Sequence, residues 1–511
     1  MASPLLASLD LGTGRVRAVA IDLKGRIVAE AAEPTPTHFP QSGWAEYHPQ
    51  ELWQVVRRVL SHLAETAKSL GTIQGFATGS MGEAGVLIDE DGRELGPIIA
   101  WYCGRTVTDG EKMRATLGDD YIFRTSGVTG SPSFSLAKIL WWRRCHPDVF
   151  AKARRWLNMA DWVAFRLTGE ARTDYTLASR TNAIDLGKLA WSSGLLGKLD
   201  IDPDLFAPLI ASGAVVGRVH TRAAEETGLP LGLPVSGGGH DHVISTVAAD
   251  TTAPGILLDS MGTAEGLILA NDRPIFEDAL RRGGNQQSAF YLDTPRYKLM
   301  CGLTTSGGAI EWFRRQVGGT SYASLIAEAQ KLPPGSNGLC FLPQLRGGDQ
   351  PYPNPHARGA FIGITGDASP GALFRSVLEG LCLSTRLGFD HLSAIKGVTP
   401  VSRIRVIGGG TRNDLMMKIK ASVYGRPLEV TALSEATCLS AAILGGIGAG
   451  VFSSVAEAQE RMAEGLGTAR LVEPDPHWAA RYDELYHTVY AQLPAALNAT
   501  HDALARFRDG A

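Results

Sequence analysis

The first residues that could do chemistry lie in a polar turn near the start of the chain. Asp10, Gly12, Thr13 and Arg17 lie in or beside this turn, between two β-rich runs. Backbone N–H groups of such a turn can form a nest for a phosphate, to which Thr13 adds a hydroxyl donor and Arg17 a charge. Asp10 could hold Mg²⁺ through water, since Mg²⁺ keeps several waters and typically uses one or two carboxylates plus substrate phosphates. The alternative is an ordinary hairpin, and a Walker A loop is excluded because its glycine-lysine pattern is missing here.

A second polar turn with the same Gly-Thr pair follows about 250 residues later. Gly262 and Thr263 stand between two predicted strands, Gly255–Asp259 and Glu265–Leu269. Two such turns facing each other across a cleft would hold the two ends of a triphosphate. Taken alone, the second turn is also explained as a plain turn. The pair is a weak internal repeat that suggests two related α/β domains, with a boundary near residues 245–254.

A run of three glycines, Gly408 to Gly410, marks a third candidate site. It lies between a predicted strand and a helix that opens at Asn413. The flat backbone of Gly409 and Gly410 would let an adenine ring or a phosphate approach closely. The run reads G-G-G-T-R-N and lacks the third glycine of the dinucleotide fingerprint, which argues against a Rossmann dehydrogenase. The alternative is a close-packed turn from strand to helix.

An earlier glycine run ends in His240, Asp241 and His242, at the end of a predicted strand. Phosphoryl transfer to an alcohol needs a group that accepts the hydroxyl proton, and Asp commonly has this role in kinases. A His-Asp-His metal site is a rival interpretation. Because neighbouring residues of a strand point to opposite faces, we expect that the three side chains do not all face one ion. A structural role is the remaining alternative.

Two further segments carry groups that suit a polyhydroxylated ligand. Glu83 and Arg105 could form hydrogen bonds with its hydroxyls, and Trp101 could pack on its carbon skeleton. The alternative, a surface ion pair beside core aromatic residues, is the interpretation that the sequence alone favours.

The elements that must position these residues predict an α/β fold. Predicted strands alternate with turns over the first 90 residues, and the later strands precede the glycine runs. A helix beginning at Pro49 carries an apolar stripe at helical spacing, and a helix of small residues at Glu435–Gly446 would let another element approach closely. The other predicted elements of the first half are strands at Leu5–Leu9, Arg15–Asp22, Ile27–Ala31, Ile73–Thr78 and Ala84–Ile88, and helices at Leu136–Arg143 and Asp161–Leu167.

Composition limits the class of protein. The chain has 511 residues, a net charge of −3 and 44% hydrophobic residues, which allow a large core and argue against disorder and a dedicated nucleic-acid binder. Its 59 glycines exceed the usual share of about 7%, as expected where backbone must approach a ligand. No apolar run is long enough to cross a membrane, so no membrane partner is expected. Six scattered cysteines and a start unlike a signal peptide predict a cytoplasmic protein.

In this order, the motifs resemble the FGGY family of carbohydrate kinases, over roughly residues 5–455. The resemblance includes the segment from Arg358 to Thr365. It implies two ribonuclease-H-like (actin-like ATPase) domains with an interdomain cleft, which we place at residues 1–248 and 249–511. The resemblance also implies ATP and Mg²⁺ as cofactors, with Mg²⁺ near Asp10, and makes a homodimer a reasonable default. It assigns Asp241 as the catalytic base and Glu83, Trp101 and Arg105 to the sugar. The remaining matches are to phosphate and adenosine contacts: Asp10, Gly12, Thr13, Arg17, Gly262, Thr263, Gly409, Gly410 and Asn413.

The implied activity is transfer of the γ-phosphoryl group of ATP to a hydroxyl of a pentulose-like ketose or a polyol. Xylulokinase-like members usually have Met-His where this chain has Gly82 and Glu83, and glycerol-kinase-like members have a polyol-binding Glu there. The role of the extra His240 before the base stays open, as do the sugar and the hydroxyl. Two alternatives from other classes are an actin-like ATPase switch without a sugar and a sugar-binding pseudo-kinase regulator.

Overall fold

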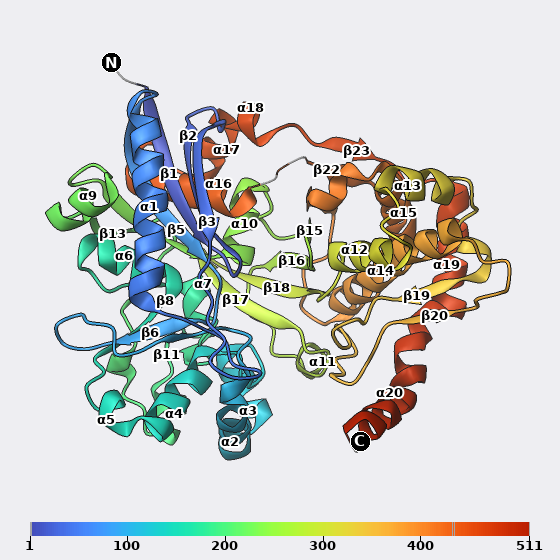
Figure 1. The fold of residues 1–511 in the computed structure, drawn as a ribbon, viewed down its shortest axis with the longest axis horizontal. Coiled ribbons are helices and arrows are strands. Elements are labelled where there is room, and N and C mark those ends of the chain that lie inside the picture. Colours follow the sequence, from blue (N-terminus) through green and yellow to red (C-terminus); the bar gives the residue numbers. More distant parts are fainter. Residues whose placement is uncertain (1–2, 432, 434, 510–511) are drawn as a thin grey trace.

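Two β-sheets organise the chain, one from each half of the sequence (Figure 1). The computed structural model describes residues 3–431, 433 and 435–509. The first sheet has six strands in the order β13-β14-β5-β1-β2-β3. Their bounds are β1 Pro4–Leu11, β2 Arg15–Asp22, β3 Ile27–Pro34, β5 Thr72–Ser80, β13 Val215–Arg218 and β14 Pro234–His240.

Three strands of this sheet end at the same edge. β5 lies between β1 and β14 and is parallel to both, with Asp10 paired to Gly79 and His240 paired to Ser80. Because the carboxyl ends of parallel strands meet at one edge, this register brings the first polar turn, the Glu83 segment and Asp241 together.

The second sheet has seven strands in the order β17-β18-β16-β15-β21-β22-β23. β15 and β21 are parallel, and Met261 pairs with Gly408, so the second polar turn and the glycine run leave the sheet side by side. The bounds are β15 Ile256–Met261, β16 Glu265–Asn271, β17 Gln286–Tyr291, β18 Pro295–Leu303, β21 Arg403–Gly408, β22 Leu428–Val430 and β23 Arg470–Val472.

The helix α1 (Pro49–Lys68) illustrates how the sequence pattern positions an element. Proline stands at its first position, where no intrahelical N–H is needed. The predicted apolar stripe is buried in full, from Leu52 to Leu63, and packs in the core of the first half. The prediction of this amphipathic helix is confirmed.

Two helices lie between the sheets and join the halves. α10 (Asp241–Ala248) and α16 (Ala436–Gly448) share one buried apolar cluster with strands of both sheets. In Figure 1, α16 lies beside β1 and β2 although it comes late in the chain. The predicted close approach is to β5, since a Cβ on Gly445 would lie 2.8 Å from the carbonyl carbon of Phe76. Small residues of α16 therefore serve packing between the halves.

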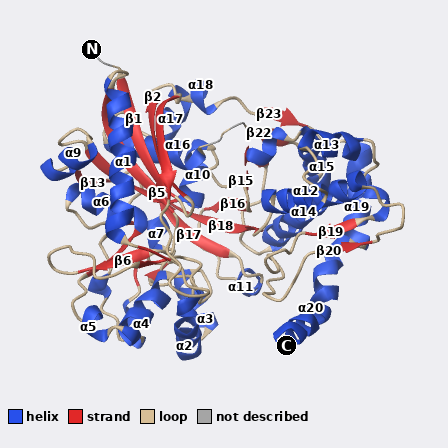
Figure 2. Ribbon diagram, viewed as in Figure 1, coloured by secondary structure: helices blue, strands red, loops and turns tan. Residues whose placement is uncertain are grey.

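Among the other helices, α6 packs against the first sheet and α14 against the second, whereas α2 to α5 and α20 lie away from both sheets (Figure 2). The predicted helices at Leu136–Arg143 and Asp161–Leu167 appear as α4 and α6, and the predicted helix opening at Asn413 appears as α15. No helix among the described residues is both long and apolar enough to span a bilayer, and the six cysteines are free thiols. Besides α1, α10 and α16, the helices of eight or more residues are α2 Val107–Leu117, α3 Asp119–Ser126, α4 Ser135–Cys145, α6 Met159–Thr168, α12 Gly307–Gln316, α13 Tyr322–Gln330, α14 Pro370–Ala394, α15 Asp414–Tyr424, α19 Pro476–Thr488 and α20 Leu493–Asp509.

Short elements complete the fold, mainly in the lower part of the first half. The short strands are β4 Glu46–Tyr47, β6 Gly85–Ile88, β7 Ile98–Ile99, β8 Arg155–Asn158, β9 Thr173–Asp174, β10 Ile184–Asp185, β11 Ala190–Trp191, β12 Leu209–Ile210, β19 Cys340–Leu342 and β20 Ala360–Ile362. The short α-helices are α5 Pro147–Phe150, α7 Tyr175–Ala178, α8 Ser193–Lys198, α9 Thr221–Thr227, α11 Asp278–Arg282, α17 Val455–Arg461 and α18 Ala463–Leu466.

Candidate active site

A cavity of about 380 Å³ opens between the two halves, where β1, β5 and β14 end. Four residues that the sequence singled out line it: Thr13, Glu83, Trp101 and Asp241. The second half contributes the turn after Thr263 and part of β16 to β18. Chemistry-bearing residues from distant parts of the sequence thus share one cavity, the kind of site that small-molecule ligands occupy.

Asp10, the last residue but one of β1, has a half-buried side chain whose carboxylate is not fully paired. Its Oδ1 has no hydrogen-bond partner among the described residues. Burial raises the pKa of Asp10 well above its usual range, and the nearby carboxylates of Asp241 and Glu435 raise it further, against the lowering effect of Arg17. A bound cation would offset both the missing partner and the repulsion, so this side chain fits the predicted Mg²⁺.

The first turn places its hydroxyl in the cavity. The Gly12 N–H donates to the Arg15 carbonyl at 3.0 Å and closes the hairpin. Thr13 lines the cavity, and its Oγ1 accepts a hydrogen bond of 3.0 Å from the indole of Trp101. Trp101 keeps 40% of its surface exposed and packs edge-on against Tyr102. The same indole therefore fixes the Thr13 hydroxyl and also lines the cavity.

Arg17, predicted as a phosphate contact, lies outside the lining of this cavity, as do Asp10 and Thr263. It pairs with Asp10 in the strand register, but its guanidinium forms ion pairs of 2.7 Å with both Glu30 and Glu435. Glu435 immediately precedes α16, so Arg17 connects the first hairpin to the helix between the sheets. Its charge is already compensated by two carboxylates and is not left over for a phosphate.

The second turn presents exposed backbone, held from behind by a helix. Gly262 and Thr263 are exposed, and no hydrogen bond of the Thr263 side chain to a described residue is present. The N–H groups of Gly307 and Gly308, which open α12, donate at 3.0 Å to the carbonyls of Gly262 and Thr263. The Gly262 N–H also donates to the Ala264 carbonyl at 2.8 Å, so the turn is fixed from within and the Thr263 hydroxyl is the group left for an anion.

Beneath the second turn lies a buried ionic network that the sequence did not reveal. The ammonium of Lys420, on α15, lies 2.6 Å from Asp259 and also contacts Glu265, and all three side chains are fully buried. Ser306 donates to the other oxygen of Glu265 at 2.6 Å. Burial and Glu265 raise the pKa of Asp259, while Lys420 opposes that shift. A lysine on a mostly apolar helix face was the only signal in the sequence, and it named no partner.

The glycine run lies against the second turn, as the strand register requires. A Cβ on Gly408 would lie 2.4 Å from the Met261 carbonyl, so the chain has to pass here with φ of +95°. The space above Gly409 is open, since a Cβ added to this residue would meet no heavy atom within 4 Å. Asn413 caps α15 by accepting from the Met416 N–H, which leaves both donors of its amide nitrogen for a ligand.

Asp241 opens α10 directly after β14. The strand ends at His240, so the alternation argument does not extend to Asp241 and His242, and all three residues line the cavity. Their ligand atoms still do not gather into a group that could hold one metal ion among the described residues, as expected. His240 Nε2 lies 3.2 Å from Asp241 Oδ1. Burial lowers the pKa of His240 well below its usual range, helped by the positive charge of Arg180, so the imidazole is neutral beside the carboxylate.

Glu83 lines the acceptor side of the cavity in an unusual backbone conformation. Its φ is +62°, a left-handed value that non-glycine residues rarely adopt and that concentrates at functional sites. Ser135 donates to its carbonyl at 3.1 Å, and Arg180 donates to its carboxylate at 2.8 Å. Sequence reasoning missed Arg180 because it belongs to no motif and lies 97 positions from Glu83.

Arg105 is not part of the cavity, which corrects its predicted contact with the sugar. Its side chain is 2% exposed and pairs with Glu46 at 2.6 Å. The guanidinium also lies over the rings of Trp44 and Trp141. The alternative of an ion pair beside core aromatics is therefore right, except that the pair is buried.

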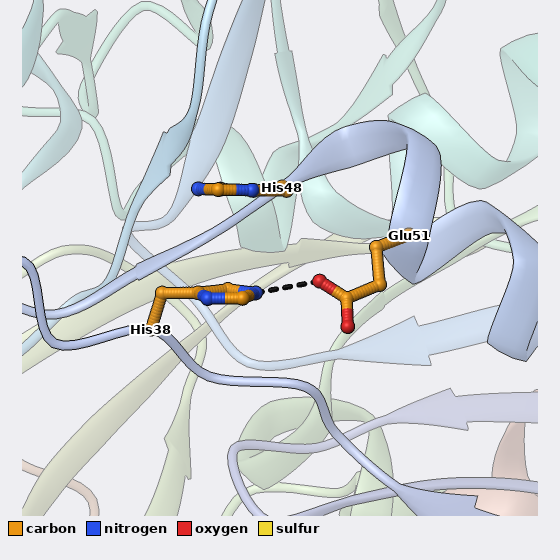
Figure 3. A group of neighbouring side chains, drawn as sticks. All are labelled: His38, His48 and Glu51. Carbon is orange, nitrogen blue, oxygen red and sulfur yellow. Dashed lines mark hydrogen bonds and ion pairs between the residues drawn. The ribbon is translucent and has the colours of Figure 1, made fainter.

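His38, His48 and Glu51 form the one group of possible metal ligands found among the described residues (Figure 3). His38 Nε2 lies 2.5 Å from Glu51, and the two imidazole rings stack with centroids 4.1 Å apart and planes 9° from parallel. Lone pairs of ring nitrogens lie in the ring plane, so those of two parallel, stacked rings do not converge on one ion. The group is a hydrogen-bonded stack, away from the cavity residues.

Comparisons with known proteins agree with this site. The model of the FGGY family of carbohydrate kinases, N-terminal domain, matches residues 5–248, and that of the C-terminal domain matches residues 257–449. A glycerol kinase of Gloeobacter violaceus is 30% identical over 463 residues, 89% of this chain and 90% of the relative. An L-fuculokinase of Escherichia coli K12 is 29% identical over 474 residues, 90% of this chain and 96% of the relative.

Solved structures show the same architecture. The crystal structure of xylulose kinase from Rhodospirillum rubrum has a TM-score of 0.88 at 29% identity and covers 98% of this chain and 100% of that one. The predicted resemblance and the two-domain α/β fold are thereby confirmed, and the actin-like ATPase architecture is that of the structural neighbours. The chain belongs to the FGGY family of carbohydrate kinases and is a phosphotransferase that uses ATP and Mg²⁺ to phosphorylate a hydroxyl of a sugar or polyol.

Proposed function

We propose that Asp241 is the catalytic base of this kinase and that its acceptor is an uncharged ketose, pentulose-like, or a polyol. The observation that carries the proposal is the shared cavity, which Asp241 lines together with Thr13 and Glu83. Asp241 takes the proton of the acceptor hydroxyl while the hydroxyl oxygen attacks the γ-phosphorus and the bond to the β-phosphate oxygen breaks.

The nucleotide side of the proposal uses the two turns and the glycine run. The N–H groups of the turns, with the hydroxyls of Thr13 and Thr263, hold phosphate oxygens. Mg²⁺, when bound, neutralises charge on the phosphates, and Asp10 would hold it. The remaining nucleotide contacts in this proposal are Gly12, Gly262, Gly409, Gly410 and Asn413, with the open space above Gly409 available to adenosine.

Charge in the cavity favours an uncharged acceptor. Arg180 compensates Glu83 at 2.8 Å, while the neighbour of Asp241 is a neutral imidazole. Asp241 therefore remains as an uncompensated carboxylate that would repel a sugar acid. Glu83 and Trp101 take the acceptor: a carboxylate accepts from hydroxyls, and an indole face packs on their carbon skeleton.

We place the two domains at residues 1–248 and 249–511 and the protein in the cytoplasm. The domain boundary is supported by the limits of the two sheets, and the location by the six free thiols. A homodimer stays an expectation of the family resemblance.

The test is an acceptor panel in which the release of ADP is followed with pentuloses, hexuloses, tetritols, pentitols and glycerol. We expect fast turnover only with one class of acceptor, and a phosphorylated product of that acceptor. Equal ADP release without any acceptor would instead support an ATPase switch, and tight sugar binding without ADP release would support a pseudo-kinase regulator.

A further inference from the structure

Arg180 lies behind the acceptor side of the cavity and joins two residues that line it. Its Nε donates to Glu83 Oε1 and its Nη2 donates to Gln286 Oε1, both at 2.8 Å. The Arg180 side chain is fully buried, and the ring of Phe134, another cavity residue, lies 4.8 Å from the guanidinium carbon. The rigid, planar fork of arginine fixes both partners at once, which a lysine cannot do.

These two bonds determine which atoms face the ligand. Arg180 donates to Glu83 Oε1. Glu83 Oε2 has no hydrogen bond to a described residue, so this oxygen can accept a hydrogen bond from a ligand hydroxyl. Gln286 gives its carbonyl oxygen to Arg180, which leaves its NH₂ group to donate. The amide orientation follows from the arginine, because a guanidinium has only donors.

We propose that Arg180 is a positioning residue that sets a paired acceptor and donor, Glu83 Oε2 and Gln286 Nε2, for two neighbouring oxygens of the substrate. The class of substrate is then a vicinal diol or a hydroxy ketone. One of its two oxygens, a hydroxyl, donates to Glu83 Oε2, and the other accepts from Gln286 Nε2. This inference rests on the proposed function, since it describes the acceptor of the same reaction. Sites built from fixed hydrogen-bonding groups reject analogues that lack the matching hydroxyl, because the buried polar groups then stay unpaired.

The fork also connects the acceptor site to the second half of the chain. Glu83 follows β5 of the first sheet, whereas Gln286 begins β17 of the second. β17 is fastened to the first half farther along, where the Ala289 N–H donates to Ser179 Oγ at 2.9 Å. The donor and the acceptor therefore come from different halves, and their spacing depends on Arg180.

The first test replaces Arg180 by lysine, which keeps the charge and removes the fork. Its matched control is Arg166→Lys, because Arg166 pairs with Glu94 outside the cavity. We expect Arg180→Lys to raise KM for the best acceptor of the panel at least about tenfold, the loss of one charged hydrogen bond, and to leave KM for ATP within about twofold. Equal increases in both KM values, or an unchanged KM for the acceptor, would show that Arg180 has only a structural role.

A second variant, Gln286→Leu, tests the donor without disturbing the buried charge. Here the measurement is the ratio of kcat/KM between the best acceptor and its deoxy analogue that lacks the neighbouring hydroxyl. We expect this ratio to fall at least about tenfold, since the group that rejected the analogue is gone. A retained ratio contradicts the paired donor and acceptor even if Arg180→Lys does not fold. Failure of the unaltered protein to phosphorylate any acceptor would instead contradict the proposed function itself, and this inference with it.

Discussion

The two Gly-Thr hairpins occupy matching places in the two sheets but differ in what faces their carboxylates. In each, one aspartate keeps a buried oxygen without a partner among the described residues and has a raised pKa: Asp10 in the first and Asp259 in the second. Only in the second does a buried ammonium, that of Lys420, lie against the carboxylates, Asp259 and Glu265. The first hairpin is therefore electrostatically incomplete, whereas in the second an internal counterion offsets one of the two carboxylate charges.

This difference indicates a division of labour. A hairpin with an internal counterion is rigid before any ligand arrives, as suits a fixed support for phosphate oxygens. A hairpin with an unpaired carboxylate is stabilised only when a cation binds, as expected for the metal side of the site. The comparison predicts that removing charge weakens the fold at one hairpin and strengthens it at the other.

The largest effect is expected for Lys420→Met. It leaves two buried carboxylates without their counterion, and breaking a buried ion pair in this way typically costs about 3–5 kcal/mol of unfolding free energy. Denaturant unfolding would measure the loss. Lys418→Met is the control, because Lys418 lies on the same helix but is exposed and pairs with Asp475; it should cost less than about 1 kcal/mol. Similar losses of unfolding free energy in the two variants would show that Lys420 does not act as an internal counterion.

Asp10→Asn should have the opposite effect on stability. An amide has no charge to bury and does not repel Asp241 and Glu435, so we expect the ligand-free protein to gain about 1–3 kcal/mol of unfolding free energy. Phosphoryl transfer should fall at least tenfold, since each 1.4 kcal/mol of lost stabilisation is a factor of about ten. Asp22→Asn is the control: hydrogen bonds and Arg26 lower the pKa of Asp22, so its amide variant should lose stability. If Asp10→Asn were less stable than the unaltered protein, the first hairpin would not be electrostatically incomplete.

The effect of Asp10 should depend on pH. A carboxyl whose pKa is higher in the folded than in the unfolded chain contributes most below its unfolded pKa, and this contribution is lost as the pH rises toward the folded pKa. The stability advantage of Asp10→Asn should therefore grow as the pH is raised from about 4 upward. Thermal unfolding of Asp10→Asn and the unaltered protein across this pH range measures the difference. A stability advantage of the variant that shrinks with rising pH would show that the Asp10 carboxylate is paired.

The smallest effects are expected for the two threonines. Thr13→Val should raise KM for ATP about fivefold to tenfold, because it removes one donor and leaves the Trp101 indole without its partner. Thr263→Val loses only an outward hydroxyl and should have the smaller effect. Steady-state kinetics with varied ATP compares them, and a larger loss at Thr263 would reverse the ranking.

The sequence predicted much of the framework because local patterns set it. The stripe of α1, the two hairpins and the capped helix after Asn413 all follow from neighbours within a few residues. The edge where Asp10, Glu83 and Asp241 meet follows from parallel strands.

Side-chain partners distant in sequence could not be predicted in this way. Arg105 and Arg17 were expected to contact ligands because arginine often does so. In the structure, Arg105 pairs with Glu46 and Arg17 pairs with Glu435. The alternation of side chains between the two faces of a strand applies only within the strand. β14 ends at His240, and the next residue already belongs to α10. Arg180 belongs to no motif, and only the fold shows its partners.

The most direct test of the account is Asp241→Asn, measured by acceptor-dependent ADP release with nucleotide binding as the internal control. The account predicts that turnover falls at least about 10²-fold, because the acceptor hydroxyl loses its base, while the Kd for ATP stays within about twofold. Unchanged turnover in a variant that binds ATP normally would show that Asp241 is not the base and would contradict the central claim.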